Sequence, residues 1–122
     1  MPPGRALPGP DDLLPLRPVE ALILTMLAAG DRHGYGLRHD ILDHSGGRIA
    51  LEAGNLYRHI RRLEAAGCLA ESDQRPAHHN DERRIYYRLT PFGKKVLAAE
   101  MVRLRSLVRL AEERRVISPF RP

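Results

Sequence analysis

The sequence predicts a mainly α-helical fold with one small β-hairpin, and three observations lead to this prediction. Three short segments in the first half place apolar residues at helical spacing and end at glycines. Two stretches with strand character then follow around a polar loop. A long helical pattern closes the 122-residue chain with apolar residues spaced alternately four and three apart. We therefore expect one compact domain followed by a long C-terminal helix.

The first 17 residues read as a flexible, proline-rich tail. Prolines this dense prevent a continuous helix. Three leucines near the end of this segment could still pack onto the domain. The prolines are Pro2, Pro3, Pro8, Pro10 and Pro15, and the leucines are Leu13, Leu14 and Leu16.

Three helices are expected next. Proline is favoured at the first helical position, so the first helix should begin at Pro18 and stop before Gly30. The second should run from about Gly34 to His44, and the third from about Ala53 to Ala66. The apolar faces consist of Val19, Leu22, Ile23, Met26 and Leu27, of Leu37, Ile41 and Leu42, and of Leu56, Ile60 and Leu63.

A β-hairpin should complete a winged helix-turn-helix domain over residues 18–89. Its strands are predicted at 69–72 and 85–89, with a polar loop between them. Alternation along the second strand places Ile85, Tyr87 and Leu89 on one face. We expect Tyr87 in the core, Tyr86 near DNA or solvent, and Tyr35 in the core.

The last helix, predicted over residues 90–117, is expected to form a dimer. Thr90 and Pro91 are a strong helix start, and residues 118–122 form a short tail. A helix of about 27 residues spans roughly 40 Å, too long to pack only on a domain this small. Its apolar seam, suited to a partner helix, comprises Leu97, Met101, Leu104, Val108 and Ala111.

The third helix carries the chemistry of major-groove reading. Arg58 and Arg61 fall roughly opposite its apolar face, and Asn55 and Arg62 flank them. Arginine can bond bidentately to guanine, and asparagine to adenine. A solvated basic helix face is the alternative interpretation.

The hairpin adds positive charge beside that helix. Arg83, Arg84 and Arg88 lie on or next to it, and Arg75, His78 and His79 lie in its loop. A basic hairpin can hold phosphates while a helix reads bases. The alternative interpretation is a hairpin whose charges contact solvent and only keep it soluble.

Several short motifs together resemble the PadR family, the phenolic acid decarboxylase regulators. These motifs are Gly54-Asn55-Leu56-Tyr57, Arg61-Arg62-Leu63-Glu64 with Gly67, Arg84-Ile85-Tyr86-Tyr87-Arg88-Leu89-Thr90 with Gly93, and His33-Gly34-Tyr35-Gly36-Leu37. The resemblance covers roughly residues 16–102. It implies a winged helix-turn-helix, dimerisation through the last helix, and a transcriptional repressor that often responds to a small molecule.

The resemblance also implies a DNA contact for Tyr57, and a half-buried structural tyrosine is the equally weighted alternative. The family usually has threonine at Asn55 and proline at Arg58, so operator sequences of relatives do not transfer to this chain. In this sequence the hairpin is followed by one helix and no additional effector domain. The family resemblance implies a small-molecule effector, but these residues do not indicate where it would bind.

Composition limits the other functional classes. The formal charge of +5 fits a nucleic-acid partner, and one cysteine, Cys68, allows no internal disulfide. We expect Cys68 to be buried, and we expect a cytoplasmic protein without a membrane span, cofactor or metal. His39 and His44 are poorly spaced for one metal, and no catalytic motif is evident. A winged-helix module that binds proteins instead of DNA is the alternative function.

Overall fold

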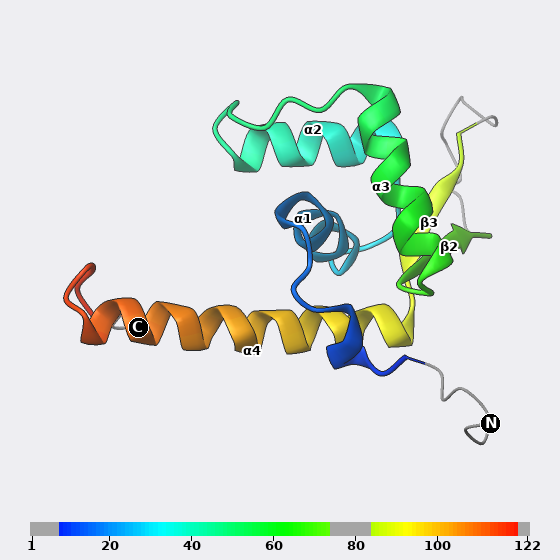
Figure 1. Ribbon diagram of the computed structural model, residues 1–122. Coiled ribbons are helices and arrows are strands. Elements are labelled where there is room, and N and C mark those ends of the chain that lie inside the picture. Colours follow the sequence, from blue (N-terminus) through cyan, green and yellow to red (C-terminus); the bar gives the residue numbers. More distant parts are fainter. Residues whose placement is uncertain (1–7, 74–83, 120–122) are drawn as a thin grey trace, which may run out of the picture.

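The computed structural model describes residues 8–73 and 84–119, which form a helical domain with a long helix along one side (Figure 1). Within this part of the chain the fold is mostly helical with a small antiparallel sheet, as predicted. The helices are η1 (Pro10–Leu13, a 3-10 turn), α1 (Pro18–Leu27), α2 (Gly34–His44), α3 (Ala53–Ala65) and α4 (Pro91–Glu113). The strands are β1 (Arg32–His33), β2 (Leu69–Ser72) and β3 (Tyr86–Leu89).

Local capping explains where two of the helices begin. The Thr90 hydroxyl accepts a hydrogen bond from the Gly93 N–H at 2.9 Å, and Pro91 follows at the first helical position of α4. At α2, the His33 Nδ1 atom accepts from the Gly36 N–H at 3.0 Å. These side chains satisfy N–H groups that the first turn of a helix leaves unpaired.

The sheet has one strand more than the sequence predicted. β3 lies in the middle, with β1 and β2 antiparallel on its two sides. A two-residue strand such as β1 is too short to show an alternating pattern. It pairs His33 with Tyr86, and the two rings meet edge to face with centroids 5.1 Å apart.

This pairing overturns two predictions for the second strand. Tyr86 was expected near DNA or solvent, yet it is only 7% exposed because His33 covers it. Ile85 was expected in the strand, on the same face as Tyr87, but it precedes β3 and is exposed. Tyr87 is buried as predicted.

The second half of the predicted flexible tail packs on the domain. Leu16 is buried in the core, and η1 lies against α4 (Figure 1). The buried Glu100 carboxylate takes two hydrogen bonds from Arg103, at 2.7 and 2.8 Å, and one from the Leu16 backbone. These bonds, Arg103 first, hold the pKa of Glu100 below its usual value. The expectation of a flexible tail is therefore wrong for residues 8–17, whereas the packing suggested for Leu13, Leu14 and Leu16 is confirmed. Residues 1–7 lie outside the described part.

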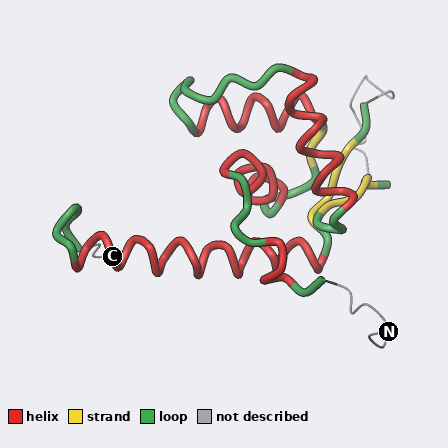
Figure 2. Tube along the Cα trace, in the orientation of Figure 1, coloured by secondary structure: helices red, strands yellow, loops and turns green. Residues whose placement is uncertain are grey.

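The long helix differs from its prediction at the first residue of its apolar seam and at its C-terminal end. Leu97 is only 9% exposed and belongs to the core of its own domain, so it is not free for a partner. α4 ends at Glu113 rather than at Ile117, and Arg115 then has a positive φ of 60°. The second half of the helix extends beyond the other helices (Figure 2). None of the described helices has the length and apolar character that crossing a membrane requires.

Candidate nucleic-acid interface

One face of α3 is polar and exposed to solvent, and the opposite face is apolar and buried. Leu56, Ile60 and Leu63 are buried, as predicted from their spacing. Asn55, Arg58 and Arg61 are exposed on the remaining surface of the helix. The loop before α3 is held by Arg38, whose Nε donates to the Leu51 carbonyl at 2.8 Å. The exposed face therefore combines two guanidinium groups and an amide on a well-anchored helix.

Arg62 lies differently from the other two arginines because it pairs with α1. Its Nε is 3.7 Å from Oε2 of Glu20, and His59 Nδ1 is 2.8 Å from the same oxygen. Glu20 is only 4% exposed, and Arg62 keeps about two fifths of its side chain in solvent. A buried carboxylate needs such partners. Glu20 and His59 were missed by sequence reasoning, since an acidic residue in the first turn of a helix usually only complements the helix dipole.

The expected basic hairpin is described only in part. Arg84 is exposed, its Nη1 is 3.0 Å from His33 Nε2, and its guanidinium lies 5.5 Å from the centre of the Tyr35 ring. Tyr35 was expected in the core, yet it is 63% exposed in the first turn of α2, where Arg84 lies over its ring. Arg83, like Arg75, His78 and His79, lies outside the described residues.

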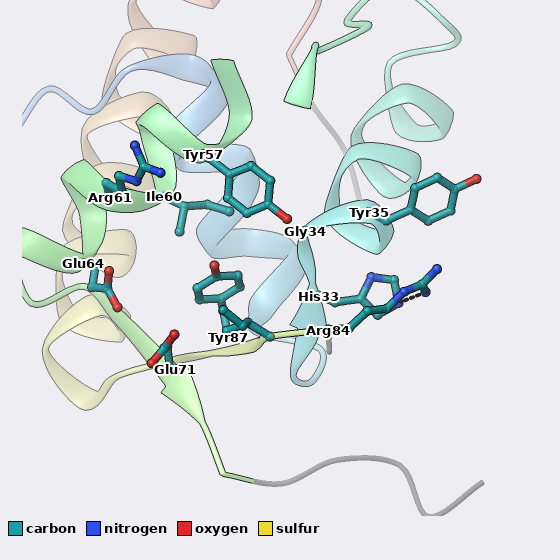
Figure 3. Close-up of a pocket in the computed structure, with 11 residues that line it drawn as sticks. His33, Gly34, Tyr35, Tyr57, Ile60, Arg61, Glu64, Glu71, Arg84 and Tyr87 are labelled. Carbon is teal, nitrogen blue, oxygen red and sulfur yellow. Dashed lines mark hydrogen bonds between the residues drawn. The ribbon is translucent and has the colours of Figure 1, made fainter. Parts of the chain in front are cut away.

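A pocket of about 570 Å³ separates α3 from the hairpin and the start of α2 (Figure 3). Tyr57, Arg61 and Arg84, three of the predicted DNA-binding residues, line it. Figure 3 shows the Tyr57 side chain reaching from α3 toward Gly34, above Tyr87. The structure thus brings α3 and β3 residues to one hollow that the sequence pattern did not indicate.

Gly34 leaves the room that the Tyr57 side chain occupies. A Cβ atom at this position would stand 2.5 Å from the Tyr57 hydroxyl oxygen. We expect Gly34→Ala to cost about 1 kcal/mol of unfolding free energy, because the tyrosine must move. Urea denaturation measures this cost. In a Tyr57→Ala background the same substitution should cost little, and an equal cost in both backgrounds would contradict the contact.

The remaining sequence expectations concern cysteine and metal chemistry. Cys68 is buried as predicted, and burial, aided by the charge of Glu20, raises the pKa of its thiol. Among residues 8–73 and 84–119, no group of three or more histidine, cysteine or acidic side chains could hold a metal ion. The described site therefore consists of arginines, an amide and tyrosines around α3.

Comparison with models of protein families identifies the family of this chain. The model of the transcriptional regulator PadR-like family matches residues 23–99, which include α2, α3 and the described part of the hairpin. This chain belongs to the PadR-like family. The family is one of transcriptional regulators, and the resemblance identified from the sequence motifs is confirmed.

Solved structures support the same assignment for this PadR-like chain. A transcriptional regulator from Clostridium thermocellum is 25% identical, with 78% of this chain and 87% of that chain covered and a TM-score of 0.65. A PadR family transcriptional regulator from Eggerthella lenta is 29% identical, with coverages of 76% and 80% and a TM-score of 0.59. A PadR family regulator from Clostridium difficile, 22% identical, shares the fold with coverages of 78% and 95% and a TM-score of 0.64. The comparison with curated proteins found no significant match.

Proposed function

We propose that this PadR-like regulator is a sequence-specific DNA-binding repressor that acts as a homodimer on an inverted-repeat operator. The observation that carries the proposal is the exposed face of α3, where Asn55, Arg58 and Arg61 lie on the helix that buries its other side in the core. A helix of this kind can lie in the major groove, where its side chains reach base edges. Membership of a family of transcriptional regulators supports this interpretation.

The proposed contacts divide into base reading and backbone positioning. Arg58 and Arg61 offer bidentate hydrogen bonds to guanine, and Asn55 offers them to adenine. Arg62, tied to Glu20, and Arg84, next to His33, are better placed to position the protein on phosphates. Tyr57 and Arg83 complete the proposed DNA-binding set.

The second half of α4 is the proposed dimerisation surface. Met101 and Val108 are exposed, and Leu104 and Ala111 are half-buried on the same side of the helix. Leaving such a strip in water forgoes about 25 cal/mol for each Å² that a partner would cover. Leu107 and Leu110 are also exposed beside it. A second copy of the chain, packed through these residues, would place two α3 helices in opposite senses.

This symmetry sets the expected operator. Two α3 helices that enter successive major grooves on one face of the duplex lie roughly 34 Å apart. The operator should therefore contain two inverted half-sites whose centres are about 10 base pairs apart, or a multiple of that distance.

Recovery of bound genomic DNA, followed by binding assays on the top site, tests the proposal directly. We expect Arg58→Ala or Arg61→Ala to cost about 1–3 kcal/mol of binding free energy and to relax preference at one base position. Arg109→Ala, which removes the same charge from the far half of α4, is the matched control. Affinity should also fall steeply as salt rises. Unchanged operator binding by the Arg58→Ala/Arg61→Ala double variant would contradict the assigned face, and no recovered DNA would favour a protein-binding module.

A further inference from the structure

The pocket between α2, α3 and β3 has the size and lining of a small-molecule site. Its volume of about 570 Å³ falls within the range of roughly 300–1,000 Å³ that such sites occupy. The side chains of Tyr57, Ile60 and Tyr87 form its apolar middle (Figure 3). Figure 3 shows the carboxylates of Glu64 and Glu71 close together at one end of the pocket.

The Tyr87 hydroxyl is a buried polar group without a hydrogen-bond partner in the described part of the chain. Tyr87 is 6% exposed and lines the pocket, and its hydroxyl points toward the space beneath Tyr57 (Figure 3). A buried hydroxyl that makes no hydrogen bond is costly. Burial is the main cause that raises the pKa of Tyr87 to about 12, and the charges of Tyr57, Glu64 and Glu71 add to it. The positive charge of Arg61 acts in the opposite direction and lowers this pKa. The hydroxyl therefore stays protonated and available to a ligand.

The pocket is lined by two carboxylates and two guanidinium groups, and the two carboxylates lie at the same end. Glu64 projects from α3 and Glu71 from β2, and neither forms an ion pair with residues 8–73 or 84–119. Arg61 is the guanidinium on their side of the pocket (Figure 3). Arg84, at the other end, is held by His33 and Tyr35. Two carboxylates therefore face one arginine around two aromatic rings.

We propose that this pocket binds a small aromatic amine, with its ammonium group held by Glu64 and Glu71 and its ring held between Tyr57 and Tyr87. Aromatic rings pack favourably against one another, and carboxylates give an ammonium group charge-assisted hydrogen bonds. The Tyr87 hydroxyl then gains the partner that it lacks.

Such a ligand would also act on DNA binding, a consequence that rests on the proposed function. Tyr57 and Arg61 line the pocket and belong to the proposed DNA-binding set. A molecule packed against them restricts where these side chains can point. Ligand and operator should therefore compete, each weakening the other's binding by the same factor.

Ligand binding is measured first, without DNA, using tryptamine as the probe. The chain contains no tryptophan, so indole fluorescence reports the probe alone. Tryptophol and indole-3-propionate keep the ring and replace the ammonium by a hydroxyl or a carboxylate. We expect tryptamine to bind at least about tenfold more tightly than either. Equal or tighter binding of indole-3-propionate, or no binding of tryptamine, would overturn the proposal.

Matched variants locate the site. The Glu64→Gln/Glu71→Gln double variant should weaken tryptamine binding about tenfold, and Tyr87→Phe about threefold. Tyr86→Phe, a change of the same kind at the next residue of β3, and Glu113→Gln at the end of α4 should leave it unchanged. Thermal unfolding verifies that each variant is folded. Tryptamine affinity that is insensitive to the first two variants would overturn the assigned pocket.

Operator binding with and without tryptamine then tests the regulatory consequence. We expect saturating tryptamine to weaken operator binding by about tenfold in the unmodified protein, and much less in the double glutamine variant. If tryptamine binds at the pocket but operator affinity does not change, the regulatory part is wrong. A chain that binds tryptamine but no DNA would contradict the proposed function and not the ligand site.

Discussion

Replacing Val108 with glutamate is expected to dissociate the proposed dimer and to weaken operator binding by about 100-fold. Val108 is 43% exposed on α4, so the substitution leaves the core of the single domain intact. In a dimer it would place two carboxylates in an apolar seam without partners, which is strongly unfavourable. The loss in affinity follows because a dimer binds its second half-site at high effective concentration, typically an advantage of about 10²–10⁴.

Val108 is a cleaner position for this test than Leu104. Leu104 lines a groove with Leu22 of α1, so its replacement would also disturb contacts within one domain. Val102→Glu provides the control, because Val102 is 62% exposed on another side of the same helix. Sedimentation at micromolar concentration should find Val102→Glu dimeric and Val108→Glu monomeric. A Val108→Glu protein that remains dimeric, or an unmodified protein that is monomeric, would contradict the proposed seam.

Gly93→Ala is expected to have the largest effect on stability, about 3 kcal/mol of unfolding free energy or more. A Cβ atom at this position would stand 1.9 Å from the Cys68 carbonyl oxygen and 2.7 Å from the Cys68 carbonyl carbon. Both atoms belong to the backbone, so no side chain can rotate to make room. Overpacking of this kind typically costs 1–3 kcal/mol and occasionally more, and here two backbone segments must separate.

The hydrogen bonds around Thr90 explain why the chain cannot easily yield there. The Thr90 hydroxyl donates to the Gly67 carbonyl at 2.6 Å, and the Thr90 N–H donates to the Cys68 carbonyl at 3.2 Å. Moving the start of α4 would break these bonds. Gly54→Ala is the control, since its Cβ would meet no atom within 4 Å, and it should stabilise the protein by about 0.5 kcal/mol. In urea denaturation, a Gly93→Ala loss below about 1 kcal/mol would contradict this account.

The sequence by itself determined where α1 to α4 lie and which face of α3 is buried, although Leu42 of α2, expected on a buried face, is 40% exposed. Pro18, Thr90 and Pro91 mark helix starts through effects that act within one turn, and the structure begins α1 and α4 at the predicted residues. Leu56, Ile60 and Leu63 are buried because their spacing repeats with the period of a helix. The family could also be identified, since its motifs lie in these same local segments.

Only the tertiary structure decided which of these side chains meet residues distant in the sequence. Leu97 continues the spacing of the seam but is buried in its own domain, whereas Val108 extends past it. Glu20 pairs with His59 and Arg62 across 39 and 42 positions of the chain, and no local pattern records such a contact. The pocket around Tyr87 arises in the same way, because α3, β2 and β3 contribute its walls. The spacing of apolar residues along one segment shows which face of that segment is buried. A pocket depends instead on how several segments pack against one another.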